Sequence, residues 1–457
     1  MLDNVLHLLE GWKPVFAQER TAVRAIEQTM ASVCVVGRRP ITRSIAVREG
    51  EGGSFTADYK LFSRAPWQPH KLFVPILKDA LAFCDADFVA VGGDDTRVRK
   101  TGKKIGSAHW GRDPLSPHFH VNLQWGLRFL HGALLVPLHA RDQVAARALP
   151  VWFEEVPPPT KPGKKATDLE RAAYRAAKRE RRLSQAAVAM LKRLRAEFDE
   201  AGGADKQLVG VFDGSYCNKV VFRAELERTH VVARARKDAS LCFPFKGEGR
   251  RVYDTATFTP EDVLKDTKRK WIKVSVFHGG EWRQVRYKQV SGVLWRGGCG
   301  RRPLRLLVVA PTPYRKTKTG RLMYRQPAYL LTTDPKRSSQ QLLQAYFDRW
   351  QVEVAHREMK DTFGVGEAQV RSELSVPRQP ALAAATYSAL HLAALEAYGV
   401  RRPECLGSLP TWQREKTRPS CLDLIRQVRK EVVERAGLGP DYDLQITAES
   451  ILAAAAT

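Results

Sequence analysis

The sequence predicts a mixed α/β protein that carries a β-rich insertion and has helical segments at both ends. Short apolar runs such as Phe88–Val91 and Leu208–Phe212 read as buried strands, and they alternate with segments of helical periodicity. Between residues 238 and 328, apolar and polar side chains alternate instead, and glycine and proline recur throughout. With 457 residues and 44% hydrophobic content, the chain can bury a sizeable core, which excludes a mostly disordered protein.

The charge of the chain points to a polyanionic partner. Lysine and arginine number 75 against 49 aspartates and glutamates, which leaves a net charge of +26. Nucleic acid is the first partner that such a charge predicts, although a basic protein without that partner has the same composition. The seven cysteines are odd in number and form no C-x-x-C pair, so they predict reduced thiols in a cytoplasmic protein.

We expect five regions along the chain. Residues 1–75 are helical, since Val23, Ile26 and Met30 share one helix face, and this part either contacts DNA or caps the core. The main core follows in two parts, residues 76–237 and 329–400, and the β-rich insertion at 238–328 separates them. Residues 401–457 form a helical C-terminal region. The apolar stretch Ala381–Tyr398 contains His391 and Glu396, which favours a buried helix over a membrane span.

The first core segment begins with a strand at Phe88–Val91. Gly92 and Gly93 bound this strand, and Asp94 and Asp95 follow directly. A basic loop comes next, and then two strands joined by a short glycine-containing turn. The basic loop contains Lys100, Lys103 and Lys104. The two strands are predicted at His120–Leu130 and Ala133–Leu138.

A proline-rich loop at residues 157–165 precedes a long helix predicted at Asp168–Ala201. Between Lys161 and Arg195 there are twelve lysines and arginines against three acidic residues. This helix either carries solvated charge or contacts a phosphate backbone. Further strands are predicted at Leu208–Phe212, which ends in Asp213, and at Thr229–Arg236.

The remaining elements are also readable from periodicity. In the insertion, alternation around Ile272–Val276 and Val285–Tyr287 and the apolar run Leu304–Val309 predict strands. Ala328–Asp334 reads as a further strand. A helix then begins at Ser338, a usable N-cap, and runs to about Thr362. Two more helices are expected near 380–398 and 418–436.

The strongest chemical signal lies on the helix that begins at Ser338. Tyr346, Arg349, Glu353 and Lys360 are spaced so that all four share an arc of about 60° on one helix face. A carboxylate can hold a hard metal ion, while guanidinium and ammonium groups can hold phosphate. An exposed face with local ion pairs is the alternative interpretation of this pattern.

Two aspartates strengthen the chemical interpretation. Asp95 and Asp213 each follow an apolar strand, and reactive groups gather at the carboxyl ends of strands in α/β sheets. With Glu353 they could form an all-oxygen site of the kind that Mg²⁺ prefers, where a pair of ions can activate water and stabilise a leaving oxygen. Either aspartate alone could equally be a turn or cap residue.

The order of these motifs resembles the DDE transposases of bacterial insertion sequences. The resemblance rests on Asp94-Asp95-Thr96, on Asp213-Gly214-Ser215-Tyr216 and on the ungapped Y-x2-R-x3-E-x6-K signature, and it covers about residues 88–365. It implies a ribonuclease-H-like core. It also implies that Asp95, Asp213 and Glu353 are the catalytic carboxylates and ligands of two Mg²⁺ ions, with Mn²⁺ able to substitute. Asp94 is the adjacent alternative to Asp95.

The same resemblance implies roles for other residues and for the protein. Tyr346, Arg349 and Lys360 would grip phosphates near the cleaved end, and Tyr329 would stack on a displaced base. The basic loop with Lys100, Lys103 and Lys104 would follow the DNA backbone. The implied activity is cleavage at transposon ends and strand transfer into double-stranded target DNA by a homodimer in the bacterial cytoplasm, associated with the nucleoid.

Two rival functions fit much of this pattern. A ribonuclease-H-like nuclease that cuts without joining would share the carboxylates. A catalytically silent DNA-binding protein derived from a transposase would share the basic surface. We expect no membrane partner in any of these cases.

Overall fold

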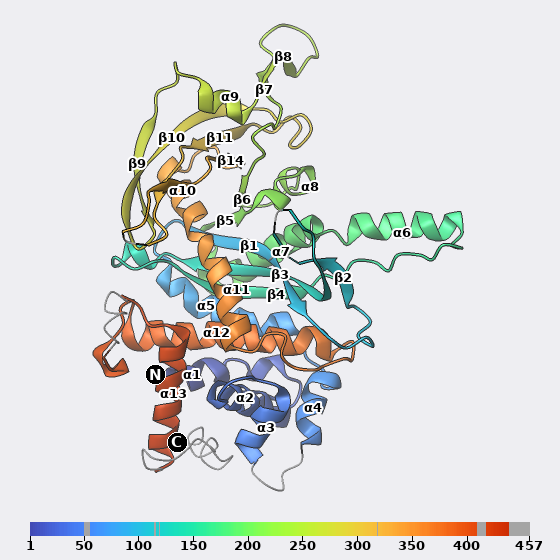
Figure 1. The fold of residues 1–457 in the computed structure, drawn as a ribbon, viewed down its shortest axis with the longest axis vertical. Coiled ribbons are helices and arrows are strands. Elements are labelled where there is room, and N and C mark those ends of the chain that lie inside the picture. The colour runs from blue at the N-terminus through green and yellow to red at the C-terminus, as the bar shows by residue number, and fades with distance from the viewer. Residues whose placement is uncertain (50–54, 114–115, 118, 318, 409–416, 438–457) are drawn as a thin grey trace.

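The computed structural model describes residues 1–49, 55–113, 116–117, 119–317, 319–408 and 417–437. A ten-stranded mixed sheet forms the centre of the molecule, and a helical layer made from both ends of the chain covers one side of it (Figure 1). The predicted fold class, an α/β core with a β insertion and helical N- and C-terminal parts, is confirmed.

Five strands form the first part of the sheet, in the order β4-β3-β1-β5-β6. The strand β1 pairs antiparallel with β3 and parallel with β5, and β5 pairs parallel with β6. The bounds are β1 (Phe88–Arg99), β2 (His109–Arg112), β3 (Leu123–Val136), β4 (Arg147–Glu155), β5 (Gln207–Phe212) and β6 (Thr229–Arg234). The short strand β2 pairs with the outer part of β3.

The insertion extends this same sheet rather than forming a separate one. Antiparallel strands continue from β6 in the order β14-β11-β10-β9. Their bounds are β9 (Ile272–His278), β10 (Glu281–Val293), β11 (Leu304–Val309) and β14 (Ala328–Thr332). Two small ribbons complete the insertion, β7 (Leu241–Pro244) with β8 (Tyr253–Phe258), and β12 (Pro313–Tyr314) with β13 (Met323–Tyr324), together with the short helix α9 (Pro260–Lys265).

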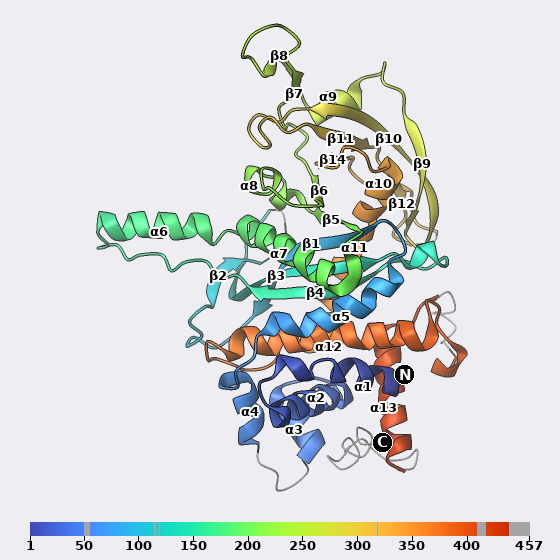
Figure 2. The same ribbon diagram turned by 180° about the vertical axis from the view of Figure 1, so that it is seen from behind.

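Helices from the two ends of the chain pack together beneath the sheet, as Figure 2 shows from behind. The long helix α12 lies between the sheet and the first four helices of the chain, while α5 packs on the sheet itself, and α12 is buried along most of its length. Their bounds are α1 (Leu2–Glu10), α2 (Glu19–Cys34), α3 (Ile41–Glu49), α4 (Thr56–Ser63), α5 (Phe73–Ala80), α12 (Ser375–Tyr398) and α13 (Cys421–Arg435). Among the described residues, no helix is long and apolar enough to span a bilayer.

Short helical turns link the larger elements. They lie at Lys13–Val15, Pro69–Leu72, Leu81–Phe83, Leu138–Ala140, Gly214–Tyr216 and Glu404–Leu406, and a wider π-type turn spans Asp199–Gly203. The helix α8 (Lys219–Phe222) is a single turn.

Three predicted elements differ from the structure because glycine does not end a strand when the neighbouring strand still pairs with it. The strand β1 runs through Gly92 and Gly93, so Asp94 and Asp95 lie within it rather than after it. The two strands expected around residue 132 are one strand, β3. A Cβ on Gly132 would come within 2.6 Å of Met190 Sδ, so the glycine serves helix packing instead of a turn.

Two long helices of the prediction are each divided. The helix expected at Asp168–Ala201 consists of α6 (Asp168–Glu180) and α7 (Leu183–Phe198), separated at Arg181 and Arg182. The helix expected from Ser338 to Thr362 consists of α10 (Ser339–Asp348) and α11 (Trp350–Thr362), interrupted at Arg349. The interruption at Arg181 and Arg182 falls within a run of good helix formers, so sequence periodicity does not reveal it, whereas Phe347, Asp348 and Trp350 around Arg349 are weaker helix formers.

Candidate functional site

The helix α11 lies against the central strand β1, and the candidate site forms where they meet. A Cβ on Gly92 would come within 2.6 Å of Val352 Cγ2, so only glycine allows this close approach. Because side chains alternate along a strand, Asp94 points to the same side of the sheet as Gly92, toward α11. Glu353 follows Val352 on the helix and meets Asp94 there.

Asp94 and Glu353 form the centre of the site. Ligand atoms of Asp94, Glu353 and His356 all lie within 4.8 Å of one another. Arg349 Nη1 lies 3.6 Å from Asp94 Oδ2 and 3.7 Å from Glu353 Oε1, so one guanidinium faces both carboxylates. Burial and the nearby Glu353 charge raise the pKa of Asp94 to about 8, against the opposing effect of Arg349.

Asp213 directly follows the neighbouring strand β5. In the parallel pair β1–β5, Gly93 is opposite Phe212, so the next residues, Asp94 and Asp213, lie side by side at the end of β5. Asp213 accepts hydrogen bonds from the backbone N–H and the hydroxyl of Ser215, at 2.9 and 2.6 Å. The Asp213 charge also contributes to the raised pKa values of Asp94 and Asp95.

Asp95, the first carboxylate of the sequence prediction, points to the opposite face of the sheet. Tyr216 Oη donates to Asp95 Oδ1 at 3.5 Å, and burial raises the pKa of Asp95 while Arg128 opposes that shift. The structure therefore brings Asp94 and Glu353 together with His356, and Asp213 is not part of that 4.8 Å group. Asp95 lies on the face that α7 covers. The adjacent alternative, Asp94, is the aspartate that meets the helix glutamate.

The phosphate-binding residues of the prediction lie around the same acidic group. Arg349 is mostly buried, and its Nε and Nη1 have no hydrogen-bond partner among the described residues. Burial lowers the pKa of Lys360, while the charges of Glu353 and Asp94 act to raise it. Tyr346 and Arg349 both line a cavity of about 710 Å³ beside α10 and α11.

The other predicted DNA contacts do not gather at this site. Lys100 is buried, and its Nζ donates to the carbonyl oxygens of Gly366 and Ala368 at 3.0 and 2.7 Å, so it ties two loops together. Burial lowers its pKa to about 8. Lys103 and Lys104 are exposed in a turn. Tyr329 lies within β14 and is only 6% exposed, which leaves little ring surface for stacking on a base.

A scan against protein families decides the family of this chain. Residues 16–302 match the family described as DDE superfamily endonuclease, which is more than half of the chain. The chain belongs to the DDE superfamily endonuclease family. The matched segment includes β1 with Asp94 and Asp95 and the end of β5 with Asp213, whereas Glu353 on α11 lies beyond it.

Comparisons with individual proteins add little to the family assignment. No curated protein matches this endonuclease. Among solved structures, a piggyBac transposase synaptic complex with hairpin DNA matches at 9% identity, covering 97% of this chain and 80% of that chain with a TM-score of 0.36. A similarity of this size does not bear on function.

The structure adds residues to the candidate site that periodicity did not reveal. His356 lies one turn after Glu353, is buried, and has an Nε2 without a partner among the described residues. Its ring centroid lies 4.7 Å from that of His131 on β3. The cavity beside Tyr346 is also lined by aromatic and basic side chains from β6, the insertion and α11: Arg234, Tyr314, Tyr324, Arg325 and Trp350. The i, i+3 spacing of Glu353 and His356 was the available sequence signal.

A second group of metal-binding residue types lies at the base of α13. Ligand atoms of Glu358, His391 and Cys421 lie within 4.8 Å of one another. Glu358 Oε2 already accepts from Tyr387 Oη at 2.8 Å and pairs with Arg147 at 3.3 Å. Arg418 lies near this group, and burial and the Arg147 charge lower its pKa to about 9. Two guanidiniums disfavour a cation here, so the group anchors α13 to the sheet.

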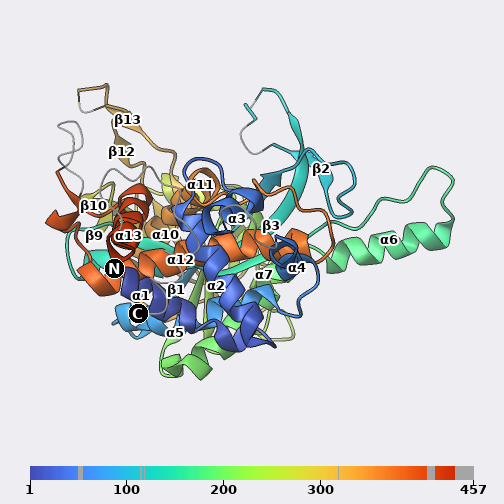
Figure 3. The ribbon, with the colours of Figure 1, turned by 90° about the horizontal axis from the view of Figure 1, so that it is seen from below.

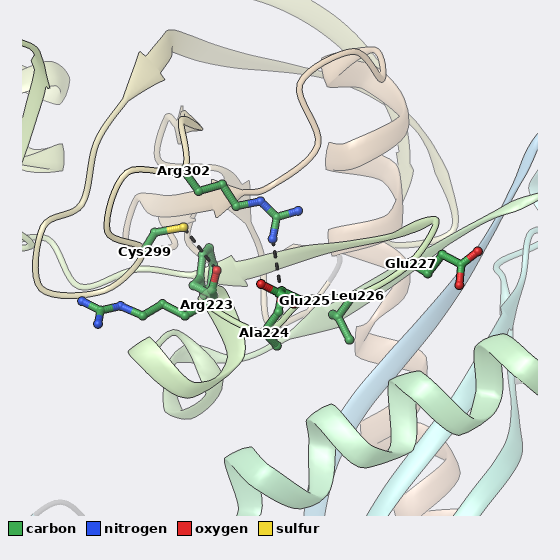
Figure 4. Close-up of a pocket in the computed structure, with 8 residues that line it drawn as sticks. Arg223, Ala224, Glu225, Leu226, Glu227, Cys299 and Arg302 are labelled. Carbon is green, nitrogen blue, oxygen red and sulfur yellow. Dashed lines mark hydrogen bonds between the residues drawn. The ribbon is translucent and has the colours of Figure 1, made fainter. Parts of the chain in front are cut away.

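The cavity of Figure 4 is separate from the acidic group. It measures about 710 Å³, and the loop Arg223–Glu227 forms one wall. Cys299 Sγ and Arg302 Nη1 close the other wall through bonds to the carbonyl oxygens of Phe222 and Ala224, at 3.2 and 3.5 Å. Arg223 and Glu227 point away from one another, so no catalytic set converges in this cavity (Figure 4).

Proposed function

We propose that this DDE superfamily endonuclease is a DNA transposase, which cuts DNA at transposon ends and transfers the freed strand into target DNA. The observation that carries the proposal is the meeting of Asp94 and Glu353, from distant parts of the chain, within one group that also faces Arg349. A nuclease of this chemistry needs acidic ligands for metal ions next to cationic groups for phosphate. Both sets are present on one face of the sheet.

The acidic group fits divalent cations. Burial first, and the Glu353 charge second, raise the pKa of Asp94, and a bound cation would favour its charged form against both effects. Carboxylate oxygens are the ligands that Mg²⁺ prefers. We propose that Asp94, Asp213 and Glu353 hold two Mg²⁺ ions, for which Mn²⁺ can substitute, and that Asp94 takes the role first expected of Asp95. When bound, such ions activate a water molecule and stabilise the leaving oxygen.

The residues around the carboxylates bind and orient the DNA. Arg349 Nε and Nη1 have no hydrogen-bond partner among the described residues and can donate to a phosphate, and Lys360 adds a positive charge beside them. Tyr346, on α10, lines the adjoining cavity, where a nucleotide next to the cleaved phosphate would lie. These contacts hold the phosphodiester against the carboxylate group and exclude water from one side of it.

A cleavage and joining assay tests the proposal. The substrate is duplex DNA carrying the ends of the element that encodes the protein. Wild-type protein should nick it only with Mg²⁺ or Mn²⁺, and pre-cut ends with a free 3′-hydroxyl should join to a plasmid target. Asp213→Asn and Glu353→Gln should abolish nicking while DNA binding persists. Nicking without joining would favour the simple nuclease, and binding without nicking would favour the silent DNA-binding protein.

Two further properties belong to the same proposal. Transposition requires two ends to be held together, so we propose that the protein acts as a homodimer on DNA. With double-stranded DNA as its partner, we place it in the bacterial cytoplasm, associated with the nucleoid. Sedimentation with and without transposon-end DNA tests the first point.

A further inference from the structure

The helix α6 and the loop before it form an arm that extends away from the body of the molecule. Figures 1 and 3, viewed at right angles, both show α6 projecting beyond every other element. None of its residues is buried, and Leu169 is 80% exposed. We define the arm as residues 157–182, from the proline-rich loop to the residue before α7. Because helices in proteins gain most of their stability from packing, a bare helix of this kind indicates a missing partner.

The charge of the arm is strongly positive and is not neutralised locally. It carries nine lysines and arginines against three acidic residues, and every one of the nine is exposed. In the described part of the chain, none of the nine forms an ion pair. Glu170 is used within the capping box of α6, where its carboxylate accepts from the backbone N–H of Thr167 at 2.7 Å.

The positive charge lies on one side of α6. Arg171, Arg175 and Lys178 share an arc of about 60° on the helix, and Arg179 borders it. Leu169, Ala173 and Ala176 occupy the opposite side. Arg171 also fastens the arm, because its Nε and Nη2 donate to the carbonyl oxygens of Ala166 and Lys164, at 3.1 and 2.8 Å. At about 1.5 Å per residue the helix is roughly 20 Å long, which is about the length of six base pairs of duplex DNA.

The base of the arm connects to the candidate active site. The arm ends at Arg182, and Ser184 in the first turn of α7 accepts a hydrogen bond from Asn218 Nδ2 at 2.7 Å. Asn218 also donates to the carbonyl oxygen of Ser215, at 2.9 Å, in the turn that follows Asp213. A duplex whose phosphate lies against Asp213 therefore passes close to the root of the arm.

We propose that the arm binds the phosphate backbone of duplex DNA away from the cleaved bond, as a clamp that supplies affinity without reading sequence. This inference rests on the proposed function, since it takes DNA as the substrate. Charge complementarity selects the occupant: a row of unpaired cations on an unpacked helix fits a polyanion, whereas a second copy of this chain, itself highly basic, would be repelled by it.

Salt-dependent binding tests the arm. Affinity for a random-sequence duplex is measured by fluorescence anisotropy in EDTA, so that no cleavage occurs, over a series of salt concentrations. The variant Arg175→Gln/Lys178→Gln/Arg179→Gln removes three charges and keeps good helix formers. We expect the slope of log K against log salt to become shallower by about 2–3, with binding at low salt at least about tenfold weaker.

A matched variant on the same helix controls for structural damage. Leu169→Gln/Ala173→Gln/Ala176→Gln places three glutamines on the opposite face and leaves the charge unchanged, so its slope and affinity should equal those of wild type. An unchanged slope in the charge variant would overturn the inference. Equal weakening in both variants would also overturn it, because it would point to the apolar face as the contact. Absence of duplex binding by wild type would instead count against the proposed function.

Discussion

Gly92 on β1 lies directly against Val352 on α11, where a Cβ atom would come within 2.6 Å of Val352 Cγ2. The contact sets the separation between the strand that carries Asp94 and the helix that carries Glu353. Glu353 is the residue after Val352 on the helix, and Asp94 is the second residue after Gly92 on the strand. The geometry of the acidic group therefore depends on a residue with no chemistry of its own.

Gly92→Ala should push α11 away from β1. We expect the added methyl group to lower the free energy of unfolding by about 1–3 kcal/mol, as for other overpacked cores, and to reduce cleavage because Asp94 and Glu353 separate. Urea unfolding and a nicking assay measure the two effects. Val352→Ala in the same chain should restore part of both, because it vacates the space that the methyl group needs.

The matched control for this prediction is Gly106→Ala. A Cβ on Gly106 meets nothing within 4 Å, so this variant should unfold and cleave as wild type does. Equal losses in both variants, or no rescue by Val352→Ala, would contradict the account of the Gly92 contact.

Comparing Asp94→Asn with Asp95→Asn should show which of the two neighbouring aspartates cleavage requires. We expect Asp94→Asn to lower cleavage by about a thousandfold or more, since losing a metal ligand removes several kcal/mol of stabilisation. Asp95→Asn should retain most of the activity, because its carboxylate lies on the other face beside Tyr216. Initial nicking rates at saturating Mg²⁺ measure both. The reverse ranking would return the catalytic role to Asp95.

Metal binding gives an independent measure of the same site. Mg²⁺ or Mn²⁺ should raise the melting temperature of wild type, because a ligand that binds only the folded state stabilises it. Removal with EDTA should reverse the shift. Asp94→Asn and Glu353→Gln should abolish it, whereas Asp95→Asn should keep it.

Glu358→Gln should destabilise the fold without involving the acidic group of Asp94. Arg147 is buried, and its ion pair with Glu358 would be lost while Arg418 stays nearby. We expect a loss of about 3–5 kcal/mol in the free energy of unfolding, the range for breaking a buried pair. Glu434→Gln is the control, because Glu434 forms an exposed pair with Lys430 and should cost at most about 0.5 kcal/mol. Similar values for both would contradict the structural role of Glu358.

His131 should make the protein less stable in acid. It is fully buried, neither ring nitrogen has a partner among the described residues, and burial lowers its pKa to about 3. Between the ordinary pKa of about 6.5 and that value, the unfolded chain binds a proton that the native chain does not. The free energy of unfolding should therefore fall by about 1.4 kcal/mol per pH unit as pH decreases.

Urea unfolding of wild type and His131→Leu across this pH range measures the His131 contribution. For His131→Leu, the free energy of unfolding should fall less steeply as pH decreases, by about 1.4 kcal/mol per pH unit, because this variant has no imidazole at position 131 to protonate. Parallel curves for the two proteins would show that His131 does not titrate in this way.

Much of the secondary structure was accessible from the sequence because local patterns determine it. Apolar runs placed β5, β6 and β11, and helical periodicity placed α12 and α13 within a few residues. Pairing and packing decided what was missed. Gly92, Gly93 and Gly132 suggested strand ends, yet each lies within a strand whose partners continue past it.

The identity and order of the chemical groups are a property of the sequence alone: two adjacent aspartates, a third after a strand, and a helix carrying Tyr346, Arg349, Glu353 and Lys360. Whether Asp94 or Asp95 meets Glu353 was decided only by the tertiary structure. Alternate residues of a strand point to opposite faces, and only the packing of α11 over Gly92 selects the face of Asp94. No local pattern contains that choice, because it depends on contacts between segments far apart in the chain.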